Sequence, residues 1–136
     1  MHNLLCLIGK TASGKSTLAD MLEAKEGYTS IVSYATRPPR SENEKGHIFV
    51  NDDVYNSMKA TNSVAVETQI GPYKYWTTLD QLYENDIYVV DPIGYAQLVA
   101  LDTPDLHVFS VYVNTPDAIR SARALDLRQD NASAFR

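Results

Sequence analysis

One short run of the chain, GKTASGKS at positions 9–16, combines residue types and spacing that suit phosphate binding. It matches the pattern G-x-x-x-x-G-K-[ST] at every fixed position, with an apolar run before it and a helical pattern after it. Glycines permit backbone conformations and close approaches that a Cβ would block. Successive backbone N–H groups can then point at phosphate oxygens where the helix begins. We therefore predict that this loop holds the phosphates of a nucleoside triphosphate.

Two side chains of the loop have individual roles in this prediction. Lys15 reaches the β- and γ-phosphates, and the Ser16 hydroxyl ligates Mg²⁺. Lys10 stands where any residue is allowed, so a solvated lysine is its simpler interpretation. For the whole motif the alternative is a glycine turn with exposed lysines. The predicted nucleotide-binding residues are Gly9, Ala12, Ser13, Gly14, Lys15, Ser16 and Thr17.

A second basic group lies in SYATRPPR, positions 33–40. Arg37 and Arg40 flank the pair Pro38-Pro39, and because proline fixes φ, the two guanidinium groups are held apart at small entropic cost. Two arginine forks that converge on one phosphate are a common way to bind it. The alternative is a solvated basic loop.

Strands and helices alternate in the segments that must position these residues. Apolar runs predict buried strands at residues 4–8, 31–34, 87–90 and 106–113. Amphipathic patterns that follow predict helices, the first ending at Gly27. This order is typical of an α/β fold.

The middle of the chain, residues 36–77, breaks the alternation. It is polar and turn-rich, with a helix capped by Asn51 and two strands joined at Gly71-Pro72. We predict one domain over residues 1–136, an α/β fold of the P-loop NTPase type with three layers and a parallel sheet. Its core is residues 1–35 and 78–119, and the middle is a small mixed β/α insertion that binds the acceptor. The end of the chain has no closing strand, so we expect that it lacks the last strand and helix of such a fold.

Composition narrows the function classes. The formal net charge of -5 and the pI of about 5.0 argue against a protein that coats nucleic acid. No apolar run is long enough to span a membrane, and the start of the chain does not resemble a signal peptide. The single cysteine, Cys6, lies in an apolar run and fits a reducing compartment, so we expect a cytoplasmic protein whose oligomeric state the sequence does not give.

Several segments in order resemble the guanylate kinases, within the nucleoside monophosphate kinases. They are the phosphate loop, VSYATRPPR, GHIFVNDDVYNSM, VETQIGPYKYWTT and VVDPIG. The resemblance covers about residues 4–94 and, more loosely, the helix that begins at Pro116. It implies transfer of the γ-phosphoryl group of ATP, with Mg²⁺, to a nucleoside monophosphate such as GMP or dGMP.

The resemblance also implies individual roles in the acceptor site. Glu67 matches the carboxylate that reads guanine, which presents two adjacent donors to two carboxylate acceptors; its alternative is an exposed strand position. Asp91 would hold Mg²⁺ through water or position Lys15, and its alternative is a helix cap. The implied acceptor residues are Ser33, Arg37, Arg40, His47, Glu67, Tyr75, Thr77 and Asp91, and the implied metal ligands are Ser16 and Asp91.

A lid is implied at residues 120–136, where arginines would close over the triphosphate. Arg128 is the expected catalytic arginine, beside Lys15, Arg37 and Arg40, and Arg136 comes next. The alternative is a helix face of solvated arginines.

The chain departs from the family pattern at three positions. His47 replaces a clamp tyrosine, Trp76 replaces a glycine, and Asp91 stands where the family has two aspartates. These changes bear on base specificity more than on the reaction class. Two alternatives therefore stay open: a P-loop kinase of the same shape for another phosphorylated small molecule, and a nucleotide- or peptide-binding module without turnover.

Overall fold

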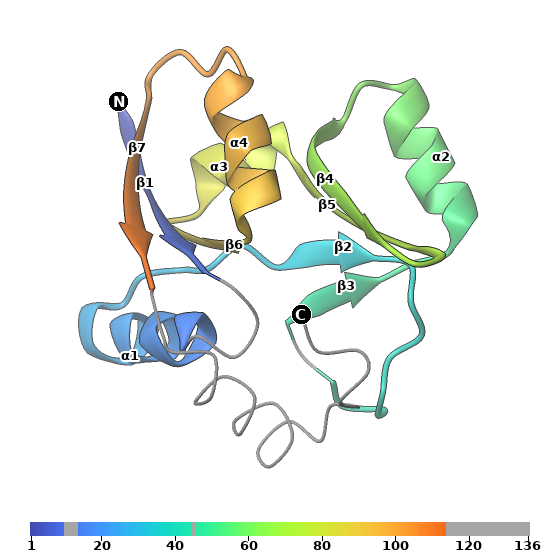
Figure 1. The fold of residues 1–136 in the computed structure, drawn as a ribbon, viewed down its shortest axis with the longest axis horizontal. Coiled ribbons are helices and arrows are strands. Elements are labelled where there is room, and N and C mark those ends of the chain that lie inside the picture. Colours follow the sequence, from blue (N-terminus) through green and yellow to red (C-terminus); the bar gives the residue numbers. More distant parts are fainter. Residues whose placement is uncertain (10–13, 45, 114–136) are drawn as a thin grey trace.

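The structure is a computed structural model that describes residues 1–9, 14–44 and 46–113. Its strands are β1 (His2–Ile8), β2 (Ser33–Ala35), β3 (His47–Phe49), β4 (Val64–Ile70), β5 (Tyr73–Thr78), β6 (Ile87–Val90) and β7 (Leu106–Tyr112) (Figure 1). Its helices are α1 (Lys15–Glu26), α2 (Asp52–Ala60), α3 (Leu79–Glu84) and α4 (Pro92–Ala100). The predicted lid and the predicted helix at Pro116 lie outside the described residues.

Three parallel strands form the first sheet, in the order β6-β1-β7. The apolar strand β1 is buried on both faces. Leu7 packs with Ala19 of α1 on one face, and Leu4 packs with Leu82 of α3 and Leu98 of α4 on the other. Helices therefore cover both faces of a parallel sheet, which confirms the predicted three-layer α/β fold.

Four strands form the second sheet, in the order β3-β2-β5-β4. β2 pairs parallel with β3 and antiparallel with β5, and β4 and β5 form an antiparallel hairpin. Gly71, at a φ of 59°, and Pro72 form the hairpin turn. Because proline keeps φ negative at the second position, the turn is of type II′, with glycine at the first. Most of this mixed sheet and α2 lie within residues 36–77, the segment predicted to be an insertion, while β2 (Ser33–Ala35) precedes it.

The strand predicted at residues 31–34 lies in a different sheet from the one expected. An isolated parallel bridge from Ser30 to Ile87 links this segment to β6, and the chain then crosses to the second sheet as β2. There the ring of Tyr34 stacks on Trp76, with centroids 5.4 Å apart. This aromatic contact and the pairing with β3 and β5 hold β2 in the insertion and not in the parallel core.

The ends of the helices follow their capping residues. Gly27, at a φ of 72°, ends α1, and the Asn51 side chain accepts a hydrogen bond from the Val54 N–H at 3.0 Å where α2 begins. Both predictions are confirmed. Within the described ranges, no helix has the length and apolar character needed to cross a membrane.

Candidate active site

The phosphate loop joins β1 to α1, as the sequence predicts. Gly9 follows β1, and Gly14 is the N-cap of α1 at a φ of 103°, a conformation that a residue with a Cβ would adopt only under strain. Glycine has no side chain to cap the helix, and the start of a helix is where backbone N–H groups can bind an anion. The Lys15 Nζ donates a hydrogen bond to the Gly9 carbonyl, across the base of the loop.

Several predicted nucleotide-binding residues cannot be placed in this site. Ala12 and Ser13 lie outside the described residues, as do Arg128 and Arg136 of the predicted lid. Ser16 lies in α1, and its side chain is likewise outside what the structure describes. Thr17 is exposed in the first turn of α1.

Asp91 lies beside the phosphate loop at the carboxyl edge of the first sheet. The register pairs Ile8 of β1 with Val90 of β6, so the residues that follow, Gly9 and Asp91, leave neighbouring strands at the same edge. Ligands bind at this edge in α/β folds. Asp91 also acts as the N-cap of α4, because its Oδ1 accepts from the Gly94 N–H at 2.7 Å. The cap expected as its alternative role is thus present, with one carboxylate oxygen committed to it.

A polar and aromatic surface lies on one face of the second sheet. The Ser33 Oγ lies 3.1 Å from the His47 Nδ1, and the His47 ring lies 5.5 Å from the Tyr75 ring and 5.9 Å from the Phe49 ring, measured between centroids. We call these four residues the clamp face. Cross-strand pairs share a face, and the pairs Ser33–His47 and Ala35–Tyr75 explain why three predicted acceptor residues meet here.

His47 titrates differently from an exposed histidine. Burial lowers the pKa of His47 below its ordinary value, and the positive charge of Arg37 lowers it further. The ring therefore tends toward its neutral form, in which it offers a phosphate one N–H donor and no full charge.

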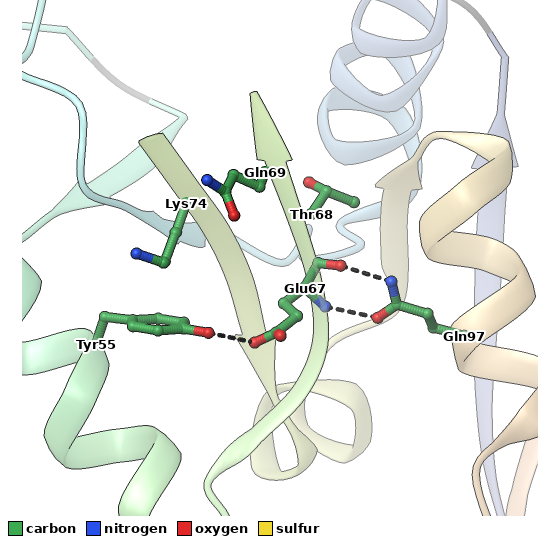
Figure 2. A pocket seen from close by; sticks show the side chains of 6 residues that line it. All are labelled: Tyr55, Glu67, Thr68, Gln69, Lys74 and Gln97. Carbon is green, nitrogen blue, oxygen red and sulfur yellow. Dashed lines mark hydrogen bonds between the residues drawn. The ribbon is translucent and has the colours of Figure 1, made fainter. Parts of the chain in front are cut away.

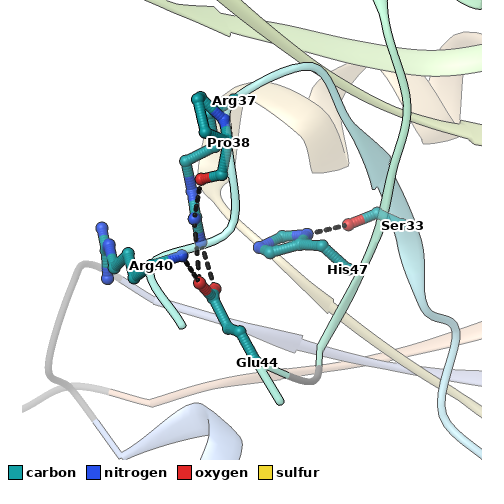
Figure 3. A network of polar contacts seen from close by, with 6 residues as sticks. All are labelled: Ser33, Arg37, Pro38, Arg40, Glu44 and His47. Atoms are coloured by element: carbon teal, nitrogen blue, oxygen red, sulfur yellow. Dashed lines mark hydrogen bonds and ion pairs between the residues drawn. The ribbon is translucent and has the colours of Figure 1, made fainter. Parts of the chain in front are cut away.

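Arg37 is bound to a residue that the sequence analysis missed. Its guanidinium group donates to both carboxylate oxygens of Glu44, at 3.1 and 2.5 Å (Figure 3). The two side chains are 11% and 18% exposed, so water screens this pair only in part. Arg37 also lies 5.2 Å from the centroid of the Phe49 ring. A loop contact seven residues apart has no periodic signal in the sequence, which is why Glu44 could not be predicted.

The two predicted phosphate-binding arginines do not converge in this structure. The Arg40 backbone N–H donates to the Glu44 Oε1 at 2.5 Å, and its side chain extends away from the Arg37 guanidinium (Figure 3). The Arg37 hydrogen bonds, then that of the Arg40 backbone, lower the pKa of Glu44 to about 2. The hydrogen bond between the Arg37 and Glu44 side chains also raises the pKa of Arg37, with smaller contributions from Tyr75. Glu44 is thus a fixed anion between the two arginines.

Thr77, a predicted acceptor residue, lies in the interior of the structure. Its side chain is fully buried, and its hydroxyl lies 3.4 Å from the Tyr88 hydroxyl of β6. Its cross-strand partner Val66 packs into the core between the two sheets. The end of β5 therefore packs between the two sheets.

Glu67 lies apart from the other predicted acceptor residues. It pairs across the hairpin with Trp76, whereas Thr68 pairs with Tyr75. Successive strand residues point to opposite faces, so Glu67 lies on the face covered by α2, which we call the α2 face. There it accepts hydrogen bonds from the Tyr55 hydroxyl and the Lys59 Nζ, both at 2.9 Å.

A cavity of about 190 Å³ opens on the hairpin beside Glu67. Its lining residues are Tyr55, Glu67, Thr68, Gln69, Lys74 and Gln97 (Figure 2). The Gln97 amide bonds to both the N–H and the carbonyl of Glu67, at 2.8 and 2.6 Å, and closes the free edge of β4. Across residues 1–9, 14–44 and 46–113, no cluster of three or more His, Cys, Asp or Glu residues could hold a metal ion.

Comparisons with known proteins agree with this architecture. In the search of solved structures, the chain is similar to the crystal structure of a guanylate kinase from Anaplasma phagocytophilum, with a TM-score of 0.68 and 19% identity, over 98% of this chain and 68% of that one. At this identity the likeness bears on the fold. No curated protein matches the chain. The sequence model described as guanylate kinase matches residues 1–134, and the chain therefore belongs to the guanylate kinase family.

Proposed function

We propose that the chain transfers the γ-phosphoryl group of ATP to a nucleoside monophosphate, with GMP or dGMP as the first acceptors to test. One observation carries the proposal. Gly9 and Asp91 follow paired strands and lie at the same edge of the sheet. At this edge the Lys15 side chain donates a hydrogen bond to the Gly9 carbonyl, and Gly14 is the N-cap of α1. Such an edge combines backbone donors, a cation and a carboxylate, the groups that a triphosphate with its metal ion requires.

The residues divide into a donor side and an acceptor side. On the donor side, the loop amides and Lys15 hold the triphosphate, and the residues that would hold Mg²⁺ are Ser16 and Asp91. The bound ion would neutralise charge on the β- and γ-phosphates. The oxygen-donor chemistry of a hydroxyl and a carboxylate fits Mg²⁺.

On the acceptor side, Arg37 and the clamp face would hold the phosphate of the monophosphate. Arginine suits this role because its planar fork matches two phosphate oxygens. Phosphoryl transfer needs alignment and charge stabilisation more than a strong base, so no covalent intermediate is required. Arg40 and Arg128 would add positive charge as the site closes, as arginines do in related reactions.

A kinase for another phosphorylated small molecule is the second candidate. The observation that favours it is the position of Glu67 on the α2 face, away from Ser33, His47 and Tyr75. A site without that carboxylate retains phosphate recognition and loses the feature that singles out guanine.

A coupled assay of ADP release tests the reaction. ATP and Mg²⁺ are supplied with GMP, dGMP, AMP, UMP, CMP or dTMP, and the variant Lys15→Ala is run beside the wild type. Lys25→Ala is the matched control, because Lys25 is an exposed lysine in the last turn of α1. Turnover with a monophosphate that is lost in Lys15→Ala and kept in Lys25→Ala supports the proposal. ADP release with none of the six acceptors, from a folded chain that binds ATP, would contradict it.

A further inference from the structure

We propose that Thr68, and not Glu67, is the β4 side chain that meets the acceptor, so that a carboxylate on β4 does not select the base. This inference rests on the proposed function and concerns its acceptor specificity. It follows from which face of the second sheet each side chain occupies.

The register of the hairpin separates the two residues. Thr68 pairs with Tyr75, and Tyr75 lies with Ser33 and His47 on the clamp face. Glu67 pairs with Trp76 on the α2 face. Figure 2 shows the Glu67 side chain directed toward Tyr55 of α2 and the Thr68 side chain directed the other way. Because the sheet lies between its two faces, a ligand whose phosphate lies on the clamp face approaches β4 from the side of Thr68 and not from the side of Glu67.

Glu67 is also held where it is by four hydrogen bonds. The Tyr55 hydroxyl and the Lys59 Nζ donate to its carboxylate, and the Gln97 amide binds its backbone N–H and carbonyl. Moving the carboxylate to the clamp face would require a one-residue slip of β4, which would turn every side chain of the strand over. The buried Val66 would then leave the core.

Thr68 is the one β4 side chain that combines a polar group, partial exposure and the clamp face. Val66 on that face is 2% exposed and apolar, and Ile70 is apolar and lies at the exposed hairpin tip. Thr77 of β5, on the same face, is fully buried against Tyr88. A threonine hydroxyl both donates and accepts, so it can bond to an edge of guanine or of adenine.

This assignment predicts weak base discrimination by the hairpin. A site that pairs a buried carboxylate with guanine rejects the mismatched base by about 10⁴-fold or more, because its polar group is left unpaired. A hydroxyl can either donate or accept a hydrogen bond, so it is not left unpaired when the base changes. We expect kcat/KM values for GMP and AMP that differ by less than about 100-fold.

Three variants of the whole chain test the assignment: Thr68→Val, Glu67→Gln and Tyr55→Phe. Binding of GMP and AMP is measured by calorimetry, turnover by ADP release, and stability by thermal unfolding. Thr68→Val should weaken binding of both acceptors by about 3- to 10-fold, the usual worth of one hydrogen bond. Glu67→Gln and Tyr55→Phe should leave both affinities and the GMP-to-AMP ratio unchanged, while each lowers the melting temperature by about 2–5 °C.

The outcomes separate this inference from the proposed function. A selective loss of GMP of tenfold or more in Glu67→Gln, or unchanged acceptor binding in Thr68→Val, would overturn the inference and leave the kinase proposal standing. A wild-type chain that neither binds nor phosphorylates GMP or AMP would overturn both.

Discussion

The guanidinium group of Arg37 donates hydrogen bonds to both carboxylate oxygens of Glu44, and the backbone N–H of Arg40 donates to the same carboxylate. The Arg37 guanidinium group, expected to bind the acceptor phosphate, thus already pairs with an internal anion, whereas Arg40 contacts that anion through its backbone and not through its side chain. A phosphate that enters this loop has to replace the carboxylate on the Arg37 fork. If Arg37 binds the acceptor phosphate as proposed, we expect the ion pair to weaken that binding and to add to the stability of the loop.

Removing the charge of Glu44 should strengthen acceptor binding. We expect Glu44→Gln to lower the acceptor KM by about tenfold, because the phosphate no longer competes with a charged hydrogen-bond partner. Glu42→Gln is the control, since it removes one charge from the exposed part of the same loop. Steady-state kinetics at pH 7 measures both. A rise in KM for Glu44→Gln would instead mean that Glu44 holds Arg37 in its binding position.

The same carboxylate makes stability depend on pH in the acid range. The Arg37 hydrogen bonds, then that of the Arg40 backbone, lower the pKa of Glu44 from an ordinary 4.5 to about 2. A lowered folded-state pKa means that the stabilisation is fully present above pH 4.5 and is lost as the pH falls toward 2. Urea unfolding of the wild type and Glu44→Gln should show a difference in unfolding free energy that shrinks across this window. A constant difference from pH 5 to pH 2 would exclude the ion pair as its source.

His47 should make stability depend on pH in a second, higher range. Burial, and then the charge of Arg37, lower its pKa below the ordinary 6.5. The unfolded chain therefore takes up a proton before the folded chain does, and stability falls as the pH drops below 6.5. His47→Gln should remove this slope while it keeps a polar partner for Ser33. A direct titration by NMR checks the cause, and a His47 pKa above 6.5 would refute it.

Trp76 should be the largest single contributor to the stability of the insertion. Its side chain is 1% exposed. The ring stacks on Tyr34 with centroids 5.4 Å apart and makes a T-shaped contact with Tyr55 with centroids 5.0 Å apart. Trp76→Ala should lower the unfolding free energy by about 3–5 kcal/mol. Ile70→Ala, at a 64% exposed apolar position in the same hairpin, should cost less than about 0.5 kcal/mol. Equal losses in the two variants, measured by chemical denaturation, would show that the aromatic stack does not anchor β5.

The structure brings some of the predicted acceptor residues together and separates others, and their roles stay predictions. The segments that resemble the guanylate kinases implied Ser33, His47 and Tyr75 as acceptor residues. Strand pairing brings these three together. The same reasoning grouped Glu67 and Thr77 with them, and the structure places one on the α2 face and buries the other. Glu44, which binds Arg37, had no signal at all, because a contact inside an irregular loop leaves no periodic pattern.

Local chemistry in the sequence was enough to predict β1, β6 and β7 of the parallel core and the order of strand, glycine and helix around residues 9–14. An apolar strand, a glycine that permits a φ of 103°, and a helix that begins at once are decided by residues next to one another in the chain. The register of the hairpin was decided by the tertiary structure alone. Three features set which face each β4 residue takes. They are the shift in pairing between Val64 and Val66, the packing of Val66 into the core and the contacts of the Trp76 ring with Tyr34 and Tyr55. Alternation in a strand tells which residues share a face, and only long-range packing tells which face that is.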